Sequence, residues 1–132
     1  LLKNAGEGSV KGAHVLVVED NMINQEIITE ILAIQGVNVS VADNGEVALT
    51  LLEEQHFDCV LMDCQMPIMD GYTASRKIRK QERFKELPII ALTGNAMAGD
   101  REKALAAGMN DHVAKPVNID ALLRVMVHWI KR

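Results

Sequence analysis

The chain has 132 residues, of which 48% are hydrophobic and 24% charged, and its formal net charge is −4. This length and composition are typical of one globular domain with a buried core and exclude a disordered chain. No apolar run approaches the roughly 20 residues that cross a bilayer. We expect no secretory leader, because Leu1 and Leu2 are followed at once by Lys3 and Asn4. The acidic balance argues against direct binding of nucleic acid.

The first twelve residues differ from the rest of the chain. Leu1 to Gly12 is polar, contains three glycines and shows no periodicity. We interpret it as a linker or a cloning remnant, and the missing initiator Met suggests a chain cut from a longer one. The domain is expected to occupy residues 13–132, without an internal repeat.

The two cysteines, Cys59 and Cys64, are predicted to point to opposite faces of a strand, so a disulfide between them is unfavourable. Unpaired cysteines are typical of a reducing compartment. Cys59 is interpreted as a small core side chain. A reactive Cys64 thiol is not favoured, because no basic residue adjoins it.

From His14 onward, strand and helix patterns alternate five times. Residues 15–18 form an aliphatic run typical of a strand covered on both faces, and residues 37–41 alternate like an edge strand. Asn21 can cap the first helix and Gly36 can end it. The apolar stripe predicted for this helix is Ile23, Ile27, Ile31 and Ile34. A turn at 43–45 leads into a second helix with the stripe Val47, Ala48, Leu51 and Leu52.

The second half predicts three more units. Strand 57–62 runs into a Pro/Gly loop and a basic helix at about 72–83, whose charges are interpreted as a solvated face. Strand 89–92 ends at Thr93 and precedes a helix at about 95–107 that Gly99 weakens. A short strand at 111–114 follows. The final helix starts near Ile119 and presents the stripe Leu122, Leu123, Met126, Val127 and Ile130.

Alternating strands and helices predict an α/β fold with a parallel sheet and helices on both faces. In such sheets the functional site forms at the carboxyl ends of the strands. Five polar residues are predicted to lie at those ends: Glu19, Asp20, Asp63, Thr93 and Lys115.

Three carboxylates on one rim repel one another, and a hard divalent cation resolves that repulsion. Mg²⁺ prefers oxygen ligands and often binds through one or two carboxylates and a phosphate. We expect Asp20 and Asp63 to ligate it directly and Glu19 to act through water. The backbone carbonyl of Gln65 is expected to add another oxygen ligand.

The same residues predict phosphoryl transfer. Asp63 can act as a nucleophile and form an aspartyl phosphate, while Mg²⁺ and Lys115 neutralise charge. The Thr93 hydroxyl can donate to a phosphoryl oxygen. Movement of Thr93 toward the new charge would shift the domain between two packings.

Five motifs give the chain a resemblance to a known family. They are Val17-Val18-Glu19-Asp20-Asn21, residues 43–49, Asp63 through Gly71, Ala91-Leu92-Thr93 and Ala114-Lys115-Pro116. In their order and spacing, residues 13–131 resemble the receiver domain of two-component response regulators, most of all those of hybrid sensor histidine kinases. The resemblance implies a flavodoxin-like, doubly wound sheet of strand order 2-1-3-4-5 flanked by five helices.

The resemblance also implies roles for individual residues. Asp63 would be the phosphoacceptor, Glu19 and Asp20 the acid pair that binds Mg²⁺, and Thr93 and Lys115 the switch and contact residues. Pro116, after a cis peptide bond, and Gly71 would be structural. One position departs from the family pattern, because His112 stands where Tyr or Phe is usual. This argues against the usual aromatic-coupled switch and favours a domain that relays phosphate.

The implied context is a phosphorelay. The partner would be a histidine kinase or a histidine phosphotransfer domain, docking around the first helix, with no nucleic acid or membrane contact. The domain would catalyse its own aspartyl phosphorylation and dephosphorylation, as a monomer or weak dimer. Its expected location is the cytoplasm, including the cytoplasmic part of a membrane-bound sensor kinase. Both a fragment of a hybrid histidine kinase and a free-standing domain are compatible with the sequence.

Three other functions fit the sequence less well. A haloacid dehalogenase-type phosphatase would carry Asp-x-Asp after the first strand, where this chain has Glu19-Asp20. An FMN-binding flavodoxin would need a Ser/Thr-rich loop there and more than one Trp, one Tyr and two Phe. A degenerate receiver that only binds protein would have lost part of the five-residue set, which is complete here.

Overall fold

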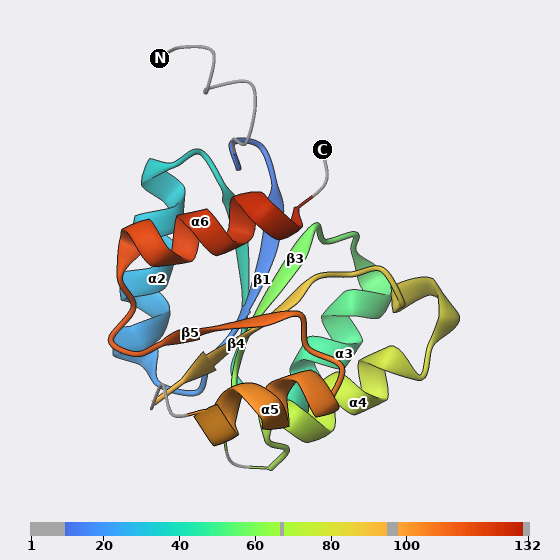
Figure 1. Cartoon of the computed structure of the whole chain (residues 1–132). Coiled ribbons are helices and arrows are strands. Elements are labelled where there is room, and N and C mark those ends of the chain that lie inside the picture. The colour runs from blue at the N-terminus through green and yellow to red at the C-terminus, as the bar shows by residue number, and fades with distance from the viewer. Residues whose placement is uncertain (1–9, 67, 95–97, 131–132) are drawn as a thin grey trace.

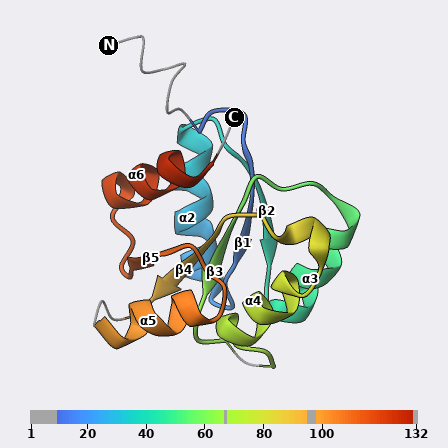
Figure 2. The ribbon, with the colours of Figure 1, turned by 45° about the vertical axis from the view of Figure 1, so that its right-hand side comes forward.

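The fold is that of a computed structural model, which describes residues 10–66, 68–94 and 98–130. Across these ranges, strands alternate with helices along the chain (Figures 1 and 2). The elements are β1 (His14–Val18), α2 (Met22–Ile34), β2 (Asn38–Ala42), α3 (Gly45–Glu54), β3 (Cys59–Asp63), α4 (Gly71–Arg79), a 3-10 turn η1 (Glu82–Phe84), β4 (Ile89–Thr93), α5 (Ala98–Ala106), β5 (Asp111–Ala114) and α6 (Ile119–Trp129). All strand pairs are parallel and the order is β2-β1-β3-β4-β5, which confirms the predicted topology.

The sheet separates two hydrophobic layers, because successive side chains of a strand point to opposite faces. Val15 and Val17 pack with buried residues of α2 and α6. Leu16 and Val18 pack with buried residues of α3, α4 and α5. Figures 1 and 2 show α2 and α6 on one face of the sheet and the other three helices on the opposite face. The expected α/β architecture with both faces covered is therefore present.

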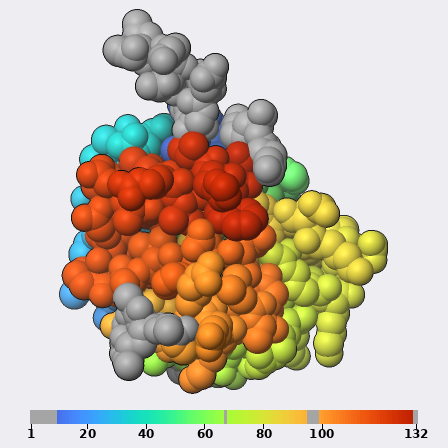
Figure 3. Space-filling view, viewed as in Figure 1, coloured from blue at the N-terminus to red at the C-terminus, as the bar shows by residue number. Residues whose placement is uncertain are grey.

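β5 forms one edge of the sheet and β2 the other. β5 lies between α6 and α5, which share the face of the molecule shown in Figure 3. The two helices flank this edge strand, and three of its four residues remain partly exposed.

Side-chain caps fix the start of four helices close to the strand ends. The side chains of Asn21, Asn44, Asp70 and Asn118 each accept a hydrogen bond from the backbone N–H three residues later. Such caps satisfy N–H groups that have no partner inside the helix. The predictions for Asn21 as a cap and for Asp70 as a helix start are confirmed.

The apolar stripe predicted for the first helix was wrong. In α2 the buried residues are Ile28 and Leu32, whereas Ile23, Ile27 and Ile34 are 67%, 50% and 80% exposed. Isoleucines occupy more than one side of this helix, so their spacing alone could not select the face that packs on the sheet. A patch of exposed apolar side chains remains on α2.

Several element limits also differ from the predictions. α4 ends at Arg79 instead of residue 83, and η1 follows it. Val10, predicted to belong to a linker, is buried against the layer of α2 and α6, and the Gly12 N–H donates to the Gly36 carbonyl. α5 begins at Ala98, and the earlier start predicted for it falls on residues 95–97, outside the described residues. Residues 1–9 also lie outside them.

Gly71 and Gly99 make a matched pair for testing the tight packing below the site. A Cβ on Gly71 would collide with the carbonyl oxygen of Asp63 and lie 2.9 Å from Met62 Cγ, whereas a Cβ on Gly99 would meet nothing within 4 Å. We expect Gly71→Ala to lower the free energy of unfolding by about 2 kcal/mol. Gly99→Ala should leave it unchanged or raise it by up to about 1 kcal/mol. Urea denaturation of both variants checks this, and equal effects would contradict the close approach at Gly71.

Candidate functional site

The five polar residues predicted from the sequence meet at one edge of the sheet. Glu19 and Asp20 directly follow β1, and Asp63 and Thr93 end β3 and β4. Lys115 directly follows β5, and its N–H donates to the Thr93 carbonyl at 2.6 Å. Parallel strands place their carboxyl ends at the same edge, so the fold itself assembles this set.

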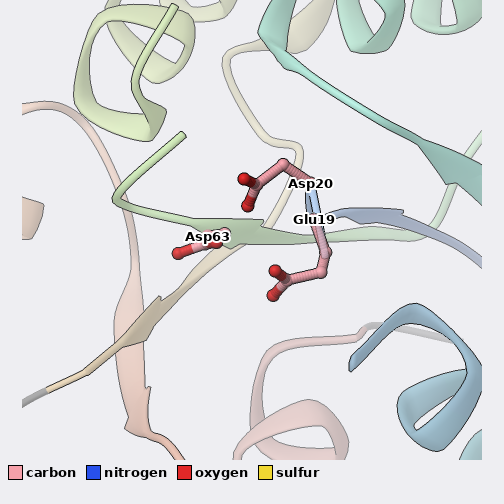
Figure 4. A group of neighbouring side chains, drawn as sticks. All are labelled: Glu19, Asp20 and Asp63. Carbon is pink, nitrogen blue, oxygen red and sulfur yellow. The ribbon is translucent and has the colours of Figure 1, made fainter. Parts of the chain in front are cut away.

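Three carboxylates form the acidic part of the site. Figure 4 shows Glu19 and Asp20 leaving the end of β1 beside Asp63 at the end of β3. One oxygen of each lies within 4.8 Å of the others. Glu19 and Asp63 are buried, with 1% and 3% of their surface exposed, whereas Asp20 is exposed. Two buried carboxylates at this separation require compensating positive charge.

Lys115 supplies that charge. Its Nζ lies 3.1 Å from Glu19 Oε1 and 3.1 Å from Asp63 Oδ2. Burial alone would lower the pKa of this ammonium, but its hydrogen bonds to the two carboxylates outweigh burial and leave the pKa raised. Lys115 therefore stays charged and holds both acids together.

Asp63 is the carboxylate most affected by its surroundings. Burial raises its pKa to about 6, with a further increase from the Glu19 charge, while the Gln65 N–H and Lys115 act in the opposite direction. The Gln65 N–H donates to Asp63 Oδ1 at 3.1 Å. One oxygen of Asp63 thus accepts from the backbone and the other from Lys115. Near neutral pH most of the carboxyl is ionised and can act as a nucleophile or a metal ligand.

Glu19 is held more completely than Asp20. Its Oε2 accepts from the Asn21 N–H at 3.1 Å and from the Asn24 amide at 3.5 Å, and its Oε1 meets Lys115. Among the described residues, no hydrogen bond restrains the Asp20 carboxylate. Asp20 therefore presents an exposed carboxylate beside the buried oxygens of Asp63.

Thr93 has a buried hydroxyl without a hydrogen-bond partner in the described part of the chain. A buried polar group left unpaired costs about 1–3 kcal/mol. The Thr93 hydroxyl is therefore available to an incoming acceptor oxygen at this edge. His112, on β5 opposite Ala91, is partly buried, and its Nδ1 lies 3.7 Å from Asp111 Oδ1.

The remaining predicted positions take structural places. The Lys115–Pro116 peptide bond is cis, as the family resemblance implied. The Gly71 N–H donates to the Cys64 carbonyl and brings α4 against the end of β3. Cys59 and Cys64 are buried in opposite layers, and burial raises the pKa of the Cys64 thiol to about 11, so the reactive-thiol alternative receives no support.

Sequence reasoning missed several polar contacts. Gln25 on α2 donates from Nε2 to the Glu19 carbonyl at 2.6 Å and to Asp43 Oδ1 at 2.8 Å. Arg79, interpreted as part of a solvated face, instead donates to the carbonyls of Gly108 and Phe84 and to the Asn110 side chain. Amides one turn after an acidic pair were the only sequence signal for the Gln25 contacts. No sequence pattern marked Arg79, whose partners lie at the end of η1 and in the segment between α5 and β5.

Comparison with known proteins agrees with this geometry. Residues 15–127 match the family model of the response regulator receiver domain. The chain belongs to this family. It is therefore a receiver domain of two-component phosphorelay signalling, as the sequence motifs indicated.

Three similar proteins illustrate the range of the family. Hybrid signal transduction histidine kinase I of Dictyostelium discoideum is 42% identical over 85% of this chain, and the chain spans 7% of that kinase. The receiver domain of sensor histidine kinase PA1611 from Pseudomonas aeruginosa PAO1 is 47% identical, with a TM-score of 0.84 over 90% of this chain and 98% of that one. Its structure has a magnesium ion coordinated in the active site cleft.

The third was crystallised with a partner. The receiver domain of the Saccharomyces cerevisiae response regulator Ssk1 forms a co-crystal with the histidine phosphotransfer signaling protein Ypd1. This structure and the present chain share 34% identity and a TM-score of 0.83 over 89% of this chain and 88% of that one.

In the present chain, none of the described helices is long and apolar enough to span a bilayer.

The raised pKa of Asp63 predicts a pH-dependent stability. Folding moves this pKa from an ordinary value of about 3.9 to about 6. The folded chain therefore binds the proton more tightly, and the stability gained from it is complete below about pH 4 and lost as the pH rises through about 6. The amide side chain in Asp63→Asn cannot titrate in this range. As the pH of a metal-free buffer rises through this window, the free energy of unfolding of Asp63→Asn should therefore increase relative to that of wild type, by on the order of 2 kcal/mol.

Urea denaturation at several pH values, with a chelator present, measures the difference between the two proteins. The contributions of other titrating groups to the pH dependence largely cancel, because both proteins contain those groups. A difference that stays constant between about pH 4 and about pH 7 would contradict the raised pKa of the buried carboxyl.

Proposed function

We propose that Asp63 is the phosphoacceptor of this receiver domain and that its donor is a phosphohistidine. The observation that carries the proposal is the contact set of the Asp63 carboxylate. The carboxylate is buried at the carboxyl edge of the sheet and is bound by Lys115 and the Gln65 N–H. The neighbouring strand ends at Thr93, whose buried hydroxyl has no hydrogen-bond partner among the described residues.

The transfer step moves a phosphoryl group from a donor imidazole to the Asp63 carboxylate. A carboxylate oxygen of Asp63 attacks phosphorus, and the bond between phosphorus and the donor imidazole nitrogen breaks with its electron pair left on that nitrogen. Lys115 balances the negative charge that gathers at the acceptor, and the Thr93 hydroxyl donates to a phosphoryl oxygen. The product is an acyl phosphate, which water can hydrolyse, so the domain would serve both phosphorylation and dephosphorylation.

The residues present fit a magnesium ion. The carboxylates of Glu19, Asp20 and Asp63 offer convergent hard oxygens, and a similar receiver domain coordinates magnesium in its active site cleft. In our assignment Asp20 and Asp63 would ligate the ion directly, Glu19 would act through water, and the Gln65 carbonyl would complete the protein ligands. Bound Mg²⁺ would neutralise charge on the phosphoryl oxygens.

The test of this proposal is phosphoryl uptake measured by intact mass. With Mg²⁺ and acetyl phosphate or a phosphorylated histidine phosphotransfer domain, wild type should gain one phosphoryl group. Asp63→Asn should gain none. Asp70→Asn is the matched control, because this helix-capping carboxylate lies outside the acidic cluster and Asn also caps helices. Uptake that persists in folded Asp63→Asn would contradict the assignment.

The exposed apolar side chains on the first turns of α2, apart from Ile34 at the end of the helix, are our proposed docking surface for a histidine phosphotransfer domain. Met22, Ile23 and Ile27 are at least half exposed on the first turns of α2, next to Asp20, and Ile68 is 75% exposed in the loop after Asp63. Both segments border the site from which the phosphoryl group must be reached. The co-crystal of a similar receiver domain with Ypd1 supports this class of partner. Large exposed apolar side chains beside a reactive group are typical of a protein interface.

The docking surface can be separated from the chemistry. Ile23→Ser and Ile27→Ser should weaken phosphotransfer from the phosphorylated histidine phosphotransfer domain by about tenfold, because buried apolar contacts at an interface centre contribute about 1–2 kcal/mol each. Uptake from acetyl phosphate should not change. Ile34→Ser is the control, because this residue is 80% exposed at the far end of the same helix. Equal losses at Ile23 and Ile34 would refute the placement.

Two further assignments stay proposals. We place the domain at residues 13–132, with the segment 1–12 joining it to a longer protein such as a hybrid kinase in the cytoplasm. The packing of Val10 in the core shows that part of that segment is folded with the domain. We also propose that His112 takes the switch position and moves when Thr93 is drawn to the phosphoryl group. Its smaller side chain suits a domain that passes phosphate onward.

A further inference from the structure

Gln25 connects three elements directly beside the acidic pair. It lies on α2, and both hydrogens of its side-chain amide are used. Nε2 donates to the Glu19 carbonyl at the end of β1 and to Asp43 Oδ1 just after β2. The Glu19 N–H is also fixed, because it donates to the Ala42 carbonyl at 3.0 Å. The backbone of Glu19 is therefore held on both sides.

This restraint matters most for the next residue. The Glu19 carbonyl belongs to the peptide bond that leads into Asp20, and a peptide unit is planar. When Gln25 fixes the direction of that carbonyl, it also fixes the Asp20 nitrogen and Cα, the point from which the Asp20 side chain leaves the backbone. The Asp20 carboxylate has no hydrogen bond of its own in the described residues. Its direction depends on the peptide that Gln25 holds.

We propose that Gln25, braced by Asp43, is a positioning residue that aims the Asp20 carboxylate at the metal site. The inference rests on the proposed function, in which Asp20 is a direct Mg²⁺ ligand. Outer-shell partners of metal ligands act in this way, because they remove the freedom that a ligand would lose on binding. Gln25 does not touch the metal or the phosphoryl group, so it acts through Asp20.

Loss of the Gln25 amide should weaken Mg²⁺ binding without impairing the chemistry at saturation. Gln25→Met keeps the length and helix preference of the side chain and removes both donors. We expect its Mg²⁺ dissociation constant to rise roughly tenfold. The rate of phosphoryl uptake should return to within about twofold of wild type when Mg²⁺ saturates the site, since only binding was lost.

Asp43 distinguishes orientation from charge. Asp43→Asn keeps the oxygen acceptor for Gln25 and removes the negative charge, and it should bind Mg²⁺ almost as wild type does. Asp43→Ala removes the acceptor and should weaken binding in the same direction as Gln25→Met. Thr29→Ala is the control on α2, one turn further along the helix on the side of Gln25 and Val41. It should not change Mg²⁺ affinity.

The experiment is a titration of each isotope-labelled protein with MgCl₂, followed by backbone amide shifts in NMR spectra, which also report whether each variant is folded. Wild-type affinity in folded Gln25→Met and Asp43→Ala would overturn the inference, as would a rate of phosphoryl uptake that stays low at saturating Mg²⁺. A wild-type chain without a saturable response would overturn the proposed function together with this inference. A wild-type response that Gln25→Met does not alter would overturn the inference alone.

Discussion

The site depends on one shared cation. Lys115 Nζ lies at equal distance from a Glu19 oxygen and an Asp63 oxygen, and both carboxylates are almost fully buried. Without a positive charge between them, two buried acids would repel each other and one would take up a proton. The ion pair therefore favours the ionised form of Asp63 and holds it close to Glu19. Breaking such a buried pair is far more costly than breaking one at the surface.

The backbone pairing of the sheet positions the Lys115 ammonium. Lys115 follows β5, and its N–H donates to the Thr93 carbonyl on β4. Because β5 pairs with β4 and β4 pairs with β3, the ammonium lies on the same edge of the sheet as Asp63 at the end of β3. At the other side, Gln25 and the Asn21 N–H hold Glu19 from the start of α2. Rigid strand ends and a capped helix thus supply the orientation, while the side chains supply the chemistry. The parts able to respond are the partly buried His112 and the Thr93 hydroxyl, which has no partner in the part of the chain that the structure describes.

Much of this could be predicted from the sequence, for physical reasons. Buried parallel strands such as residues 15–18 are continuous apolar runs in the sequence. Asp63 and Thr93 could be selected as site residues because each is the first polar residue after such a run. The face of α2 could not be predicted, since isoleucines lie around the helix and only the sheet decides which of them are buried. Contacts of Gln25 and Arg79 were also missed, because most of their partners lie on other elements and several are backbone carbonyls. Such partners leave no pattern in the sequence.

The pKa of the Asp63 carboxyl, followed by ¹³C NMR in metal-free wild type and in Lys115→Met, tests the shared ion pair most directly. The structure predicts a value of about 6 in wild type. It predicts a higher value in the variant, because Lys115→Met removes the positive charge and leaves the buried pair of acids. An unchanged pKa in a folded variant would show that Lys115 is not the charge that sustains this site.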